Sequence, residues 1–183
     1  MRKTLSIAII LTAASFVLGQ VVSTERTIGD YKKDLEKANR HFKEVNNPDT
    51  FKNYQFKNKK TGDVTNFEDL PKFDQRIFFL FQKIKLEDNL KNLQISWVAN
   101  YKKLNADSDK GKANDPYTAP AKAMHVSNAL DKLFELRKQM AVETEKTMEK
   151  VFKDFPDKFE KKEMEFSLKQ LKEMHDREEL VSR

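Results

Sequence analysis

Apolar residues recur at alternating spacings of four and three between residues 31 and 45. These residues are Tyr31, Leu35, Ala38, Phe42 and Val45. Such spacing places the side chains along one face of an α-helix. We expect the helix to begin between Thr27 and Asp30, either of which can cap it. It should end at Asn46-Asn47-Pro48, because proline disfavours the helical conformation of the residue before it.

A second apolar pattern begins at Leu70-Pro71, where proline suits the first position of a helix. Within it, the segment Ile77-Phe78-Phe79-Leu80-Phe81 is apolar nearly all round, which predicts a central buried helix. The segment could instead line an internal cavity, form a self-association face or pair as a strand. The pattern continues to Leu104, as one helix or as two that break near Lys85–Asn89.

Polar and turn-forming residues fill positions 105–120, which predicts a mobile surface loop. A third helix should start at Pro120 or Ala121 with Thr118 as a cap. Its apolar stripe weakens between Met140 and Thr147, so we expect that part to be exposed or bent.

The chain breaks again at Phe155-Pro156-Asp157, and a last helix should follow with Asp157 as its cap. Residues 50–68 predict either a short hairpin, with its turn around Thr61-Gly62-Asp63, or an irregular segment. The predicted fold class is therefore all-α: a single-domain bundle of about four helices.

Composition agrees with a helical bundle. Only 4 glycines and 5 prolines interrupt 183 residues, whereas phenylalanine is frequent, with 14 residues. The chain therefore has few helix breakers and a phenylalanine-rich core inside a surface of lysine and glutamate.

The first 19 residues have the layout of a secretory signal peptide. A basic start is followed by the uncharged apolar run Leu5–Leu18, and the small residues Val17 and Gly19 precede the expected cleavage point. We therefore expect residues 20–183 to form one secreted, extracellular domain. The chain has no cysteine, so this domain is expected to be stable without disulfides.

Charge and motifs argue against several classes of function. The chain has 35 basic and 29 acidic residues, which alternate along the sequence and indicate a solvated surface, so no nucleic-acid partner is expected. After the leader, no apolar segment is long enough to span a membrane. The histidines, His41, His125 and His175, lack the spacing of metal ligands and are expected to face solvent. Without a nucleophile motif or a phosphate-binding loop, we predict no enzyme, no metal and no cofactor.

The abundance of phenylalanine favours a binding protein that carries a small apolar ligand, such as a fatty acid, between its helices. The candidate ligand-binding residues are Ile77, Phe78, Phe81, Trp97, Phe134, Phe159 and Phe166. In overall profile the chain is similar to small secreted, helical, Lys/Glu-rich proteins that bind fatty acids and retinol, a likeness from which no residue role is transferred. The alternative is an extracellular interaction protein that acts through helix–helix contacts or self-association, by the stripe at Tyr31–Val45 or the helix from Val126.

Overall fold

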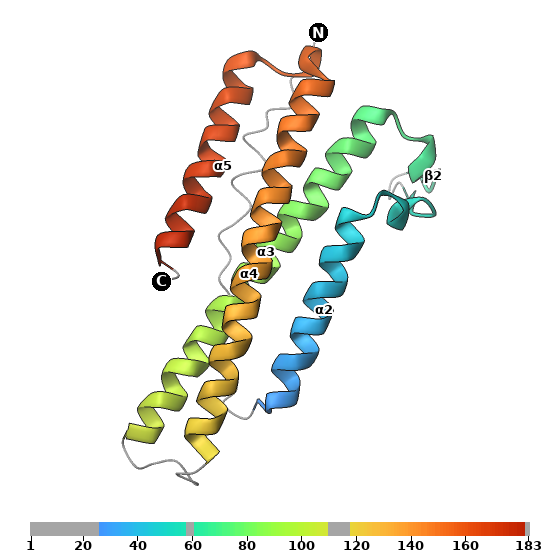
Figure 1. Cartoon of the computed structure of the whole chain (residues 1–183). Coiled ribbons are helices and arrows are strands. Elements are labelled where there is room, and N and C mark those ends of the chain that lie inside the picture. Colours follow the sequence, from blue (N-terminus) through green and yellow to red (C-terminus); the bar gives the residue numbers. More distant parts are fainter. Residues whose placement is uncertain (1–25, 58–60, 110–117, 182–183) are drawn as a thin grey trace.

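The computed structural model describes residues 26–57, 61–109 and 118–181 (Figure 1). In this part of the chain there are four α-helices: α2 (Ile28–Asn46), α3 (Lys72–Asp109), α4 (Thr118–Asp154) and α5 (Lys161–Val181). Two short strands, β1 (Gln55–Lys57) and β2 (Val64–Asn66), lie between α2 and α3. The structure confirms the predicted all-α bundle, whereas the predicted signal peptide lies outside the described residues.

The two longest helices, α3 and α4, pack against each other as an antiparallel pair. Figure 1 shows α2 along one side of this pair and α5 along the other side, beside the half of α4 that ends at Asp154. The helix α2 packs against both α3 and α4. Its start is fixed by a capping box, in which the Asp30 carboxylate accepts a hydrogen bond of 2.8 Å from the Thr27 backbone N–H.

Helices α2, α3 and α4 enclose the main hydrophobic core, which we call the three-helix core. Trp97 on α3 is its largest fully buried side chain and meets Tyr31 of α2 edge to face, with 5.1 Å between ring centroids. The buried residues of this core are Tyr31, Ala38, Val45, Leu86, Leu90, Trp97, Val126, Leu133, Leu136 and Met140. The apolar stripes of α2 and α4 therefore pack into the interior of the molecule.

The connection between α3 and α4 is shorter than the sequence predicts. Residues 105–109 belong to α3, which is one continuous helix, and α4 already begins at Thr118. Residues 110–117, the remaining part of the expected loop at 105–120, lie outside the described residues. Polar composition alone was a poor guide here, because α3 and α4 both continue as helix past the end of their apolar stripes.

The weakly apolar part of α4, which the sequence pattern predicts to be exposed or bent, has a buried residue at its centre. Thr144 is fully buried, and its hydroxyl donates a hydrogen bond of 2.9 Å to the Met140 carbonyl oxygen on the preceding turn. This internal hydrogen bond satisfies the hydroxyl, so that a polar residue continues the buried stripe.

The hairpin predicted near residues 50–68 is present as strands β1 and β2. They pair antiparallel, with Gln55 opposite Asn66 and Lys57 opposite Val64. Gly62, in the turn, has a φ of +79°, the left-handed region that favours glycine. The hairpin and its flanking turns cover one face of α3 with aromatic rings, at centroid distances of 5.2 Å for Phe51–Phe78 and 5.3 Å for Phe56–Phe78. This aromatic cluster explains why two such short strands form at all.

Within the described parts of the chain, none of the helices combines the length and the apolar character needed to cross a bilayer.

Candidate functional site

A cavity of about 610 Å³ lies where the first half of α3, the second half of α4 and α5 meet. We call it the α5 cavity. Its size falls within the range of roughly 300–1,000 Å³ that is typical of small-molecule sites. Its apolar wall consists of Phe56, Leu70, Ile77, Phe78, Leu80, Phe81, Ile84, Met148, Val151, Phe152, Phe159, Leu171 and Met174.

Side chains from α3, α4 and α5 all contribute to the wall of the cavity. Leu80, Met148, Phe152 and Leu171 are buried and form a second hydrophobic cluster that joins α3, α4 and α5. At the end of α4, the rings of Phe152 and Phe159 meet edge to face with 4.9 Å between centroids. Phe159 follows the short 3-10 helix Pro156–Lys158 and precedes α5, so it lies in the connection and not on the last helix, where the sequence pattern placed it.

Four of the seven candidate residues line the α5 cavity: Ile77, Phe78, Phe81 and Phe159. Phe81, the most exposed of the α3 wall, is 51% accessible to solvent, although an all-round apolar helix predicts burial. The reason is that Phe81 lines the α5 cavity, so the side of α3 that carries it is not closed by packing against a neighbouring helix.

The other three candidates lie elsewhere. Trp97 is fully buried in the three-helix core. Phe134 is half-buried on α4, where the Lys138 ammonium lies 4.9 Å from its ring centroid. Phe166 on α5 is 60% exposed and does not line the cavity. A phenylalanine count cannot distinguish these positions, because it carries no information on which helix faces meet.

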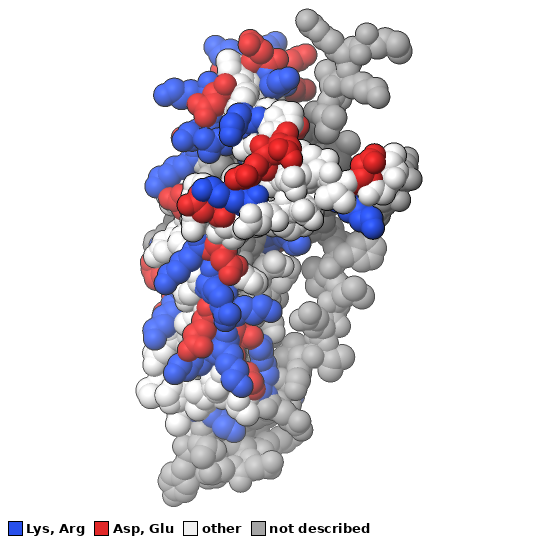
Figure 2. Space-filling model, turned by 90° about the vertical axis from the view of Figure 1, so that its right-hand side faces the viewer, with Lys and Arg blue, Asp and Glu red and all other residues white. Residues whose placement is uncertain are grey.

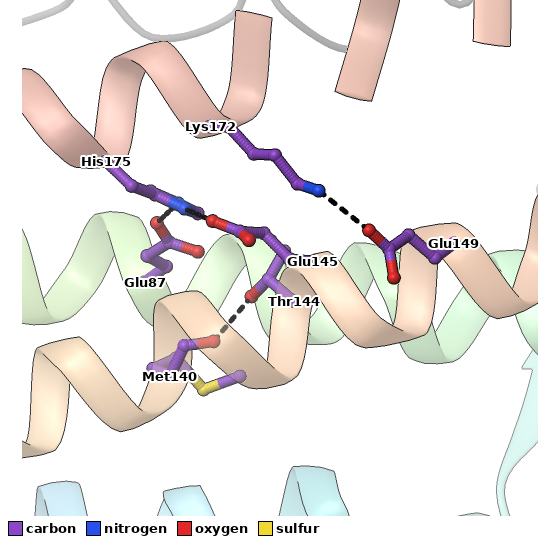
Figure 3. Close-up of polar contacts among 7 residues, drawn as sticks. All are labelled: Glu87, Met140, Thr144, Glu145, Glu149, Lys172 and His175. Atoms are coloured by element: carbon purple, nitrogen blue, oxygen red, sulfur yellow. Dashed lines mark hydrogen bonds and ion pairs between the residues drawn. The ribbon is translucent and has the colours of Figure 1, made fainter. Parts of the chain in front are cut away.

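A polar cluster lies beside the apolar wall and joins three helices (Figure 3). His175 of α5 lies between two carboxylates, with Nε2 at 2.5 Å from Glu87 Oε1 of α3 and Nδ1 at 2.6 Å from Glu145 Oε1 of α4. The His175 and Glu87 side chains are each only 10% exposed. Glu87 also lines the α5 cavity, so this cluster is part of the site.

The surroundings of His175 favour its charged form. Burial by itself lowers the pKa of the imidazole, but the hydrogen bonds and charges of Glu87 and Glu145 outweigh burial and raise the pKa above its ordinary value of 6.5. A protonated imidazole donates from both nitrogens at once, which is what two flanking carboxylates require. His175 thus fastens α5 to both α3 and α4.

The prediction that the histidines face solvent is wrong for His175, whereas His41 and His125 are exposed. The three members of the cluster are far apart in sequence, at positions 87, 145 and 175, so no local spacing reveals them. Their arrangement does not form a metal site, because the two carboxylates bind opposite nitrogens of the ring and do not converge on one point. The described residues contain no group of His, Cys, Asp and Glu that could hold a metal ion.

Basic and acidic side chains are interleaved on the surface over α2 and the adjacent helices (Figure 2). Ion pairs occur along the chain here, such as Lys52 with Asp49 at 2.7 Å and Lys146 with Glu143 at 3.1 Å. This face therefore presents no continuous field of one sign that would attract a polyanion.

No protein-family model, curated protein or solved structure shows significant similarity to this chain. The function must therefore be argued from the site itself.

Proposed function

We propose that the protein binds a small apolar molecule in the α5 cavity and acts as a non-enzymatic carrier outside the cell. The observation that carries this proposal is the cavity, whose lining is predominantly apolar and which joins three helices and the hairpin. A close-packed core leaves few voids larger than a water molecule, so a space of this size beside a well-packed core suggests a place for a ligand. The extracellular location rests on the signal-peptide pattern of residues 1–19.

The rings around the cavity suit an elongated or flat hydrocarbon. Phe81 and Met174 are partly exposed at its edge, where they would be covered by a bound molecule. Covering such surface is favourable by about 25 cal/mol for each Å² of apolar area removed from water.

The direct test is to titrate Nile red, a neutral dye that fluoresces in apolar surroundings, into the whole chain. We expect saturable binding at one site. The variant Ile77→Trp places a large ring in the cavity and should weaken binding by about tenfold or more, since it fills the space that the dye would occupy.

The matched control is Ile95→Trp, on the same helix. Ile95 is exposed and does not line the cavity, so this variant should bind the dye as the parent does. Equal binding by both variants and the parent would show that the dye does not occupy the α5 cavity, and would refute the proposed function.

The alternative function is self-association through the apolar stripes of α2 and α4, but these stripes already pack against other helices of the same molecule. Tyr31, Ala38 and Val45 of α2, and Val126 of α4, are buried against neighbouring helices of the same molecule. The structure therefore supplies no specific observation that favours self-association through these stripes.

A further inference from the structure

Glu87, which lines the α5 cavity, has one carboxylate oxygen without a hydrogen-bond partner among the described residues. Glu87 Oε1 is hydrogen-bonded to His175, but Glu87 Oε2 is buried and makes no hydrogen bond to another described residue. Glu87 as a whole is 7% exposed. A buried carboxylate oxygen without a hydrogen-bond donor costs free energy, so it is a position where a ligand's donor group would be stabilising.

The charges around the cavity have one sign. The ionisable side chains that line it among the described residues are Asp74, Glu87 and Asp88, all acidic. The remaining polar lining consists of Thr65 and Ser167, which are neutral. No basic side chain lines the cavity among the described residues. Asp88 already interacts with another group, whereas Glu87 has the buried oxygen without a hydrogen-bond partner.

The basic groups nearby do not offset this charge at Glu87. Lys83, one turn earlier on α3, lies 3.7 Å from Glu143, and Lys172, one turn earlier than His175 on α5, lies 2.9 Å from Glu149 (Figure 3). His175, when protonated, is shared between Glu87 and Glu145, so this cluster of three retains a net negative charge.

From these observations we propose that the ligand of the α5 cavity is an apolar molecule that carries a protonated amine, and that the ammonium group binds the free oxygen of Glu87. The ammonium supplies both the donor that Glu87 Oε2 lacks and the charge that complements the acidic lining. The apolar remainder of the ligand lies among the phenylalanine, leucine and methionine side chains of the wall. This inference rests on the proposed function and narrows the ligand class.

The same argument disfavours a fatty acid. A carboxylate head group would lie near Glu87 with no basic side chain among the described lining to pair with it, and like charges at short distance in a partly buried site repel strongly. The hydrocarbon tail of a fatty acid would make the same apolar contacts with the wall as the tail of an amine. These contacts therefore do not offset the repulsion at the head group.

The test compares three probes that differ only in the head group: dodecylamine, dodecanol and dodecanoate. Each competes with Nile red for the whole chain at neutral pH, below the concentration at which it forms micelles. We expect dodecylamine to displace the dye at a concentration at least about tenfold lower than dodecanoate does, the ratio expected from one charge-assisted hydrogen bond. Dodecanol should be intermediate.

Two glutamine variants show which carboxylate is responsible. Glu87→Gln removes the charge at the cavity wall and should abolish the preference for dodecylamine over dodecanoate. Glu145→Gln is the matched control, because it removes the other carboxylate partner of His175 but does not line the cavity. This control should loosen α5 to a similar degree and retain the preference.

The outcomes separate this inference from the proposed function. Equal displacement by all three probes, or equal affinity of dodecanol and dodecylamine, would leave the cavity as an apolar site and overturn the role of charge. Tighter binding of dodecanoate would also overturn it. Absence of saturable dye binding to the parent chain would instead refute the proposed function.

Discussion

The two sides of the α3–α4 pair differ in how completely they are packed. On one side α2 closes the three-helix core, where Trp97 and Leu133 are fully buried. On the other side α5 leaves a cavity of about 610 Å³ and a half-exposed Phe81. A polar cluster at His175 fastens α5 in place, whereas the buried contacts of α2 are mainly apolar. The comparison indicates that one side is closed by packing, whereas the other side keeps the space in which we propose that a ligand binds.

The largest effect is expected in the three-helix core. Trp97→Ala should lower the free energy of unfolding by about 3–5 kcal/mol, because it removes a fully buried ring and leaves a cavity. Urea denaturation measures this change. Ile95→Ala, on the exposed side of the same helix, should change stability by no more than about 0.5 kcal/mol. Similar losses in the two variants would contradict the close packing of this side.

On the other side, the polar cluster should matter most. His175→Ala leaves Glu87 and Glu145 facing each other without a shared donor. At mildly acidic pH it should lower the free energy of unfolding by about 3 kcal/mol. This value is at the low end for breaking a buried ion pair, because Glu145 keeps some contact with solvent. A loss near zero in urea denaturation would show that His175 does not fasten α5.

The same cluster predicts how stability depends on pH. Because the pKa of His175 is raised in the folded state, its stabilising contribution is fully present below the pKa of the unfolded chain and is lost as pH rises through the folded pKa. The stability difference between the parent and His175→Ala should therefore shrink as the solution becomes alkaline. Urea denaturation over a range of pH measures this difference, and His125→Ala, at an exposed histidine, should be about as stable as the parent.

Substitution by a larger side chain should have an intermediate effect on the free energy of unfolding, and this effect should differ between the two sides. Leu133→Trp forces a larger ring into the three-helix core and should cost about 1–3 kcal/mol. Ile77→Trp finds space in the α5 cavity and should cost less than about 1 kcal/mol, since its side chain enters an existing void. Equal costs in thermal or urea unfolding would mean that the α5 cavity is not an open space in solution.

The smallest effect is expected at Thr144. Its buried hydroxyl bonds to the Met140 carbonyl oxygen, which already accepts the backbone N–H bond of the helix. Thr144→Val keeps the shape and removes one donor, so the loss of stability should stay below about 1 kcal/mol. A larger loss would show that the polar group supports the packing of α4 in a way that its shape alone does not.

The helices could be predicted from the sequence because the apolar stripes repeat at helical spacing, as at Tyr31, Leu35 and Ala38. The cluster of Glu87, Glu145 and His175 could not, because it depends on how α3, α4 and α5 pack, and no spacing within one helix encodes that arrangement. Thr144 was misleading for a similar reason: its burial depends on a local hydrogen bond that an apolar pattern does not show.

The candidate site was predictable in part. The apolar run at residues 77–81 marked the α3 wall of the cavity, since so many large side chains cannot all face one helical neighbour. Trp97 and Phe134 are aromatic as well but lie on faces that meet other partners. Aromatic content therefore predicts a large apolar interior, and only the packing of the helices shows where that interior remains unfilled.

The central claim is that the α5 side binds an apolar amine while the three-helix core stays closed. The most direct measurement is a methyl NMR titration of the whole chain with dodecylamine. We predict saturable shifts at Ile77, Ile84 and Leu171, which line the cavity, and no shifts at Leu90, Val126 and Leu133, which lie in the three-helix core. An absence of shifts at the cavity methyls, or shifts of equal size in both sets, would contradict the account.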